Sequence, residues 1–219
     1  MIGDALSVTA IDTHTDLGAT RERRSGPVGV LGLLVLAVLA LGIAPVWMPE
    51  SYSWVEYGTS ESAAQGIDGA WIARSGFILF GLAVLLLVPL RRNVWQVAGS
   101  VLHTGFAVSM FAVAAFSTKP WEEGVTFVES EDLLHSLFAS VMGFCFVGGV
   151  VTVMVLRRAT SFRTVAPDIV ALAITATVML LLSSSVWGVL QRLIFLTAAV
   201  WYAREARLAR TPIRAHHTE

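Results

Sequence analysis

Long apolar runs alternate with short polar segments along this chain. A transmembrane helix needs about 20 apolar residues to cross the hydrocarbon core of a bilayer. Four runs meet that length: Pro27 to Met48, Ile72 to Leu90, Val94 to Phe116, and Leu133 to Leu156. A fifth block, Ala166 to Tyr202, is too long for one span and is interrupted by polar residues at 183–185. Dividing it at about Ala166 to Ser184 and Val186 to Tyr202 predicts six spans in all.

The charged residues support this count, because Lys and Arg near span ends gather on the cytoplasmic side. With six spans, both termini and the second and fourth loops share one side, which holds 12 of the 15 basic residues. Two large loops, Pro49–Trp71 and Ser117–Asp132, lie on the other side. They carry one basic residue, Lys119, and most of the acidic ones. We therefore predict an all-α polytopic bundle of six transmembrane helices in the plasma membrane, with both termini cytoplasmic.

The composition also indicates a bilayer environment. The 219 residues are 55% hydrophobic and 14% charged, with a mean hydropathy of +0.70, whereas an ordinary soluble domain is about 25% charged. The net charge of -1 and the lack of a basic stretch argue against nucleic-acid binding. The single cysteine, Cys145, excludes an intrachain disulfide and a cysteine-based metal cluster. We predict no metal and no cofactor.

Three regions follow from these patterns. Residues 1–26 are polar and predicted to form a disordered cytoplasmic tail, residues 27–203 the transmembrane domain, and residues 204–219 a basic cytoplasmic tail. The first tail is too long and too acidic to be the start of a signal peptide. The arginines of the last tail suit a helical extension held at an anionic inner leaflet. The oligomeric state stays open.

Ionisable residues inside a span are costly and suggest function by default. Asp168, next to Pro167, is most simply a carboxylate at the positive end of a helix dipole. His103 is predicted to be structural, bonded to a neighbouring helix. His135 shares a face with two small residues and should point into the bundle, either as a packed histidine or as a titratable group in an outward pocket. Arg74 lies at the outer end of a span, where it is either an interfacial anchor or a ligand contact.

Arg192 lies about 9 Å below the outer edge of the last span. At that depth it needs a carboxylate, carbonyl groups or an anionic ligand as its partner. The sequence offers Glu61, Glu131 and Asp132 as acidic candidates on the same side. Pairing with Glu61 or capture of an anion would each place Arg192 beside an outward-facing cavity.

Several short motifs together resemble a known family. They are Thr59-Ser60-Glu61-Ser62-Ala63, Ala70-Trp71, Gly76-Phe77-Ile78, Leu134-His135-Ser136-Leu137-Phe138-Ala139, and Gly188-Val189-Leu190-Gln191-Arg192-Leu193 followed by Trp201. In their order and membrane positions they resemble the six-span family called domain of unknown function 998, over roughly Gly26 to Tyr202. The chain departs from the family pattern at Ser62-Ala63, where Leu-Gly is usual, and at Ala73-Arg74, where an asparagine is expected. The resemblance implies a fold and no established activity.

Three functions remain open at this point. The first is binding or passage of a small anion or an anionic lipid headgroup in an outward-facing polar pocket. Its candidate ligand-binding residues are Ser60, Glu61, Arg74, His135 and Arg192. The second is a non-catalytic membrane scaffold or accessory subunit. The third is a membrane-embedded lipid hydrolase with His135 as general base, Glu61 orienting it and Arg192 stabilising an oxyanion. Membrane lipids are the expected partners in each case.

Overall fold

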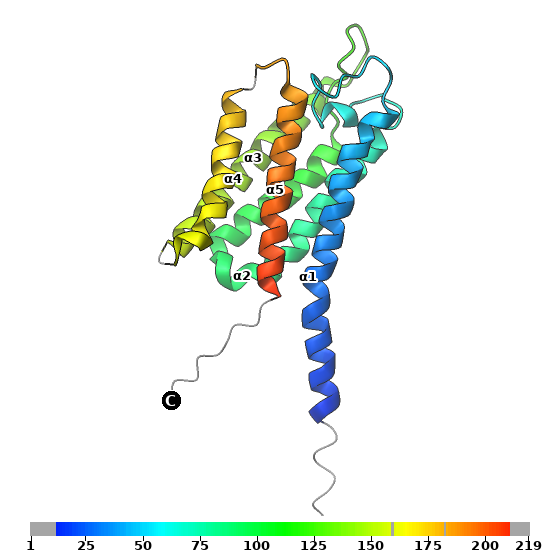
Figure 1. Ribbon diagram of the computed structural model, residues 1–219. Coiled ribbons are helices and arrows are strands. Elements are labelled where there is room, and N and C mark those ends of the chain that lie inside the picture. Colours follow the sequence, from blue (N-terminus) through cyan, green and yellow to red (C-terminus); the bar gives the residue numbers. More distant parts are fainter. Residues whose placement is uncertain (1–11, 159, 182, 211–219) are drawn as a thin grey trace, which may run out of the picture.

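The computed structural model describes residues 12–158, 160–181 and 183–210. Within those ranges the chain is helical and contains no strand. Two short 3-10 helices, η1 (Ala44–Trp47) and η2 (Glu61–Ala63), lie between the first two α-helices. The α-helices are α1 (Asp12–Ile43), α2 (Ala70–Ala115), α3 (Glu129–Arg157), α4 (Phe162–Leu180) and α5 (Trp187–Ala209), as Figure 1 shows. The predicted tails lie partly outside the described residues, at 1–11 and 211–219, while α1 includes residues 12–26.

Four helical segments are long and apolar enough to cross a membrane. They are Gly26–Trp47, α2, α3 and α4. The last helix, α5, is not among them, and its four charged residues, Arg192, Arg204, Glu205 and Arg207, lower its hydropathy. These features confirm the predicted all-α membrane-type bundle. The break predicted within the last apolar block is also present, because α4 ends at Leu180 and α5 begins at Trp187.

The 46-residue helix α2 is two helices joined at a sharp break. Gln96 has φ 55° and ψ -170°, outside the helical region, and the two halves fold back on each other. The rings of Phe80 and Phe106 lie 5.6 Å apart, and Gly81 packs against the carbonyl of Ala107. The apolar runs that end at Leu90 and begin at Val94 predict the reversal between them, but the helix continues to Trp95, whose side chain is fully buried.

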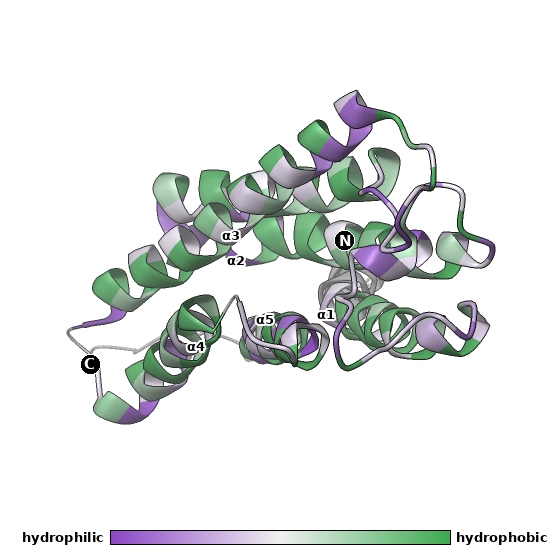
Figure 2. Ribbon diagram, turned by 90° about the horizontal axis from the view of Figure 1, so that it is seen from above, coloured by the Kyte–Doolittle hydropathy of each residue, from purple (hydrophilic) through white to green (hydrophobic). Residues whose placement is uncertain are grey.

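The helices form two rows when seen along the bundle (Figure 2). One row holds α4, α5 and α1, and the other holds α2 and α3. The first residues of α1 and the last of α5 lie at the same end of the bundle (Figure 1). We call this the inner end, and we call the opposite end, which carries the long loops at 44–69 and 116–128, the outer end. Large apolar side chains such as Phe144 and Leu180 point outward and are 82% and 87% exposed, as suits a lipid-facing surface.

Candidate functional site

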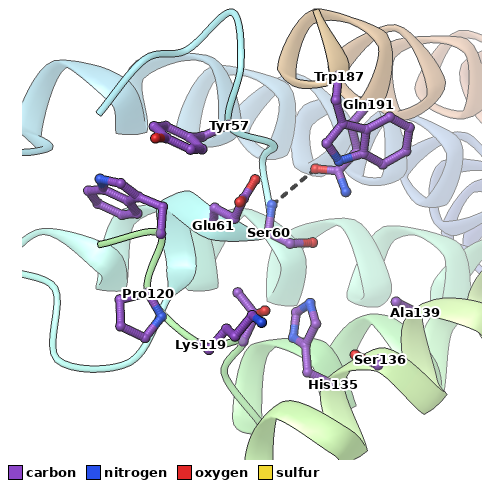
Figure 3. A pocket seen from close by; sticks show the side chains of 12 residues that line it. Tyr57, Ser60, Glu61, Lys119, Pro120, His135, Ser136, Ala139, Trp187 and Gln191 are labelled. Atoms are coloured by element: carbon purple, nitrogen blue, oxygen red, sulfur yellow. Dashed lines mark hydrogen bonds between the residues drawn. The ribbon is translucent and has the colours of Figure 1, made fainter. Parts of the chain in front are cut away.

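A cavity of about 400 Å³ lies at the outer end, between the two long loops and the first turns of α3 and α5. That volume is in the range of small-molecule sites, roughly 300–1,000 Å³. Three of the five predicted ligand-binding residues line it: Ser60, Glu61 and His135. The other lining residues are Tyr57, Thr118, Lys119, Pro120, Trp121, Ser136, Ala139, Trp187 and Gln191. Figure 3 shows Tyr57 and Glu61 on one side of the cavity, and Lys119 and His135 on the other.

His135 is the most buried ionisable side chain of the cavity, with 4% exposure. It therefore points into the bundle, as predicted. Its Nδ1 lies 2.8 Å from the carbonyl oxygen of Phe116. A carbonyl can only accept, so Nδ1 carries the proton of this bond. In the neutral ring Nε2 then carries a lone pair and no proton. This buried atom has no hydrogen-bond partner among the described residues. His135 thus lines the cavity and carries one basic nitrogen without a partner among the described residues.

Glu61 begins η2 and supplies the carboxylate of the cavity. The backbone N–H of Gly58 donates to Glu61 Oε2, which fixes one oxygen. Burial raises the pKa of this carboxyl, while the Gly58 hydrogen bond and the charge of Arg192 partly counteract that rise. The neighbouring residue Ser60 is held through its backbone, whose N–H donates to Oε1 of Gln191 at 3.1 Å. The first long loop is therefore tied to α5 at the cavity.

Arg192 does not line the cavity, because its guanidinium is hydrogen-bonded to the first long loop. Its Nη1 donates to the carbonyl oxygens of Trp54 (2.8 Å), Tyr57 (3.0 Å) and Gly188 (2.9 Å). Its Nη2 donates to the hydroxyl of Tyr52 at 2.7 Å. Of the partners that the sequence left open for Arg192, the structure shows the carbonyl groups. The missing side chain at Gly188 permits this arrangement, because a Cβ there would collide with the loop carbonyls.

Arg74 has a similar role on the opposite side of the loop. Its Nε donates to the carbonyl of Ala63 at 3.2 Å, and its Nη2 donates to the carbonyl of Ala64 at 3.0 Å. Both arginines predicted to bind a ligand therefore hold backbone carbonyls that the loop leaves without helical partners. This use satisfies carbonyl groups near the membrane surface, where unpaired backbone groups are costly.

Aromatic rings form the rim of the cavity next to Glu61. Tyr57 and Trp121 lie with ring centroids 5.7 Å apart, and Tyr52 packs on both at 5.8 and 5.0 Å. Trp187 lines the side formed by α5. Amphipathic aromatic residues are typical of the headgroup level of a membrane. The rim is therefore suited to contact with a molecule that lies partly in the headgroup region.

A second polar cluster, not predicted from the sequence, lies at the inner end. We call it the inner ion cluster; it consists of Arg91, Arg157, Asp168, Arg204 and Glu205. Glu205 is fully buried and lies 2.9 Å from Arg91, 2.7 Å from Arg157 and 3.2 Å from Arg204. Because the arginines and carboxylates come from α2, α3, α4 and α5, the cluster joins four helices.

Asp168 occupies the other half of the inner ion cluster. It lies 3.0 Å from Arg204 and 3.5 Å from Arg157 and accepts a hydrogen bond from Trp201 Nε1 at 2.8 Å. Asp168 is well past the first turn of α4, which begins at Phe162. Its stabilisation by ion pairs therefore replaces the helix-dipole interpretation, since a helix dipole acts mainly on the first turn.

One sequence signal could have revealed the inner ion cluster. Between residues 27 and 210, Asp168 and Glu205 are the carboxylates on the predicted cytoplasmic side, where arginines otherwise dominate. Isolated acids among many bases are natural candidates for ion pairs. His103 lies close by and donates or accepts a bond to the Tyr202 hydroxyl at 2.9 Å. His103 is thus bonded to a neighbouring helix, α5, as expected.

The comparisons with known proteins give one family. The family described as "Protein of unknown function (DUF998)" matches residues 30–206. Neither the comparison with curated proteins nor that with solved structures finds a match. The family match covers all the residues of both polar sites.

Proposed function

This chain belongs to the DUF998 family of proteins of unknown function, and on that premise we propose that it binds the polar headgroup of a membrane lipid in its outer cavity. The single observation that carries this proposal is His135, which lines a cavity of about 400 Å³ and whose buried Nε2 has no hydrogen-bond partner among the described residues. A buried polar atom without a partner costs about 1–3 kcal/mol, so a ligand atom that bonds it is favoured.

The proposal includes the membrane topology. We propose six spans with both termini cytoplasmic, in the plasma membrane. The break of α2 at Gln96 supports the count, because 46 residues of helix would extend about 69 Å, more than twice the hydrocarbon thickness. The predominance of arginine at the inner end supports the orientation. The outer cavity then opens toward the headgroups of the outer leaflet or toward the outside medium.

A free anion shares part of this chemistry with a lipid headgroup. The sequence suggested Arg192 as its main contact, but the guanidinium is occupied by carbonyl groups. The remaining basic groups of the cavity are His135 and Lys119, and Glu61 opposes them. This mixture favours a larger polar headgroup over a simple anion.

A scaffold role is the second candidate. The observation in its favour is the inner ion cluster, in which three arginines and two carboxylates from four helices form ion pairs. Such a cluster fixes the relative positions of helices and needs no ligand. A hydrolase would need more than a free imidazole nitrogen, so the candidate general base His135 stays a hypothesis for the third function.

Native mass spectrometry of the purified protein in detergent would test lipid-headgroup binding. The probes are phosphatidylglycerol and phosphatidylethanolamine, added one at a time, with inorganic phosphate as the free anion. The variant is His135→Asn, whose amide can still donate to Phe116 while the Nε2 lone pair is absent. The control is Ser140→Ala, an exposed position one turn along α3 and outside the cavity lining.

We expect at least one lipid to bind the parent and Ser140→Ala equally, and to bind His135→Asn at least tenfold more weakly. Equal lipid binding by all three proteins would overturn the assignment of the cavity. Binding of phosphate alone would replace the lipid by a free anion.

A further inference from the structure

The charges of the outer cavity are arranged as two opposed walls. Glu61 and Tyr57 lie on one wall, and Lys119 and His135 lie on the other, as Figure 3 shows. A purely anionic ligand would be repelled by the first wall, and a purely cationic ligand by the second. A ligand that carries both charges, separated by a short linker, is complementary to the whole cavity.

The first wall is suited to an ammonium group. Glu61 Oε2 is fixed by Gly58, and no Lys or Arg of the described residues lies within 4 Å to form an ion pair with the carboxylate. The rings of Tyr57 and Trp121, 5.7 Å apart, lie beside it. Aromatic faces attract ammonium and quaternary ammonium ions within about 6 Å by cation–π interaction. Carboxylate and rings together recognise a cation better than either does alone.

The second wall is suited to a phosphate group. Lys119 is exposed at the cavity, and its ammonium forms no ion pair with a described carboxylate. The backbone N–H of Lys119 donates to Asp132 at 2.8 Å, which fixes the base of the side chain. Nε2 of His135, on the same wall, has no hydrogen-bond partner among the described residues. In the neutral ring it only accepts, and it donates to a phosphate oxygen once the ring takes up a proton, which the charge of a bound phosphate favours. A lysine and a histidinium are ordinary ligands of phosphate oxygens.

We propose that the outer cavity recognises a zwitterionic phosphoamine headgroup, with the ammonium at Glu61 and the aromatic rim and the phosphate at Lys119 and His135. This inference rests on the proposed function and names its ligand class. Phosphatidylethanolamine and phosphatidylcholine carry this group in lipids, and phosphoethanolamine carries it in solution. Because the cavity lies beside an aromatic rim suited to the headgroup level, a lipid can enter with its acyl chains left in the bilayer.

Binding measurements on lipid nanodiscs or detergent micelles can separate this inference from the proposed function. The full chain is titrated with phosphatidylethanolamine, with phosphatidylglycerol, which has the phosphate but no amine, and with soluble phosphoethanolamine. The variants are Glu61→Gln and Lys119→Gln. The control is Glu123→Gln, which removes an exposed carboxylate of the second long loop outside the cavity lining.

The parent should bind phosphatidylethanolamine at least tenfold more tightly than phosphatidylglycerol. Glu61→Gln should lose that preference by weakening only the amine lipid, Lys119→Gln should weaken both lipids, and Glu123→Gln should match the parent. If phosphoethanolamine competes with the lipid, the free headgroup is sufficient for binding. If it does not compete, the intact lipid is required. Either result agrees with recognition of the paired charges.

Two results would overturn the inference, with different meanings. If both lipids bind equally and Glu61→Gln has no effect, the paired-charge recognition is wrong while headgroup binding stands. If no lipid binds the parent under conditions in which it is folded, both the inference and the proposed function are wrong. Circular dichroism and the thermal midpoint of each variant show whether it is folded.

Discussion

Individual arginines in this chain are satisfied in two different ways. Arg192 and Arg74 donate to neutral carbonyl groups of the first long loop, so they hold backbone in place. Arg91 and Arg157 meet the buried carboxylate of Glu205, so they hold helices together. Only the second arrangement places one charge in contact with its opposite inside the bundle. Substitutions at the two kinds of arginine should therefore have different effects.

Removing the charge of Glu205 should destabilise the whole bundle. Glu205→Gln leaves Arg91 and Arg157 buried without their shared carboxylate, and breaking a buried ion pair costs about 3–5 kcal/mol. We expect a fall of about 3 kcal/mol in the free energy of unfolding, measured by denaturant unfolding in detergent. The exposed substitution Glu123→Gln is the control and should change it by less than about 0.5 kcal/mol. A Glu205→Gln chain as stable as the parent would contradict the assigned role of the cluster.

The pKa of Glu61 predicts a pH dependence of stability. Burial raises this pKa above its ordinary value, so the folded chain binds the proton more tightly than the unfolded chain does. Stability should then fall as the pH rises from the unfolded pKa through the folded value. Glu61→Gln removes this dependence, so the variant should gain stability relative to the parent as the pH rises from about 4 to 7. Thermal midpoints measured across that range check the prediction, and parallel curves for parent and variant would contradict it.

The apolar runs predicted most of the helices, because burial in lipid requires continuous apolar residues. They missed two features whose cause is tertiary. The reversal of α2 lies at Gln96 and not at residues 91–93. Arg91 and Trp95 are four residues apart on the continuing helix, and both are buried. Ser60, Glu61 and His135, which the sequence placed on the outer side, line one cavity. The loop carbonyls that bond Arg192 depend on loop conformation, which residue spacing does not specify.

Replacing Gln96 by glycine should stabilise the protein at the break of α2. Gln96 is exposed and has φ 55°, a conformation that costs a residue with a side chain about 1–3 kcal/mol and costs glycine little. Gln96→Gly should therefore raise the free energy of unfolding by about 1 kcal/mol. The control is Ala98→Gly, an exposed helical position nearby, which should lower it by about 1 kcal/mol. A fall in both variants, measured by denaturant unfolding, would contradict a strained break at Gln96.

The first long loop should become more mobile when Arg192 is replaced by lysine. The guanidinium bonds three carbonyl groups through Nη1 and the Tyr52 hydroxyl through Nη2, and one ammonium does not reproduce that planar fork. Arg192→Lys should speed amide hydrogen exchange at residues 52–58 at least tenfold. The exposed substitution Arg207→Lys on the same helix is the control. Unchanged exchange in Arg192→Lys would show that the loop is held by other contacts.

The molecule as a whole has two dissimilar ends. Ion pairs among four helices close the inner end, whereas loops around a cavity of about 400 Å³ form the outer end. The interior of the bundle contains the fully buried aromatic side chains Phe77, Phe80, Trp95 and Tyr202. This asymmetry favours binding from the outer side over passage through the bundle.

Cysteine labelling should verify the six-span topology. Single cysteines at Glu123, Ser185 and Arg92 are introduced into a Cys145→Ala chain, since Cys145 is the one native thiol. In intact cells a membrane-impermeant maleimide should label the cysteines at 123 and 185, and should label the one at 92 only after permeabilisation. Labelling at 185 that also requires permeabilisation would contradict an outer connection between α4 and α5, and with it the sixth span.

The inner ion cluster also has a consequence for how the chain is made. Arg91 and its partner Glu205 are 114 residues apart in sequence, and synthesis proceeds at about 5–20 residues per second. On the order of 10 seconds therefore pass between the synthesis of Arg91 and that of its carboxylate partner, while the intervening helices enter the bilayer. The inner end closes only when α5 has emerged almost completely. A chain that stops before Glu205 lacks the carboxylate that Arg91 and Arg157 share, so its inner end cannot form the complete cluster.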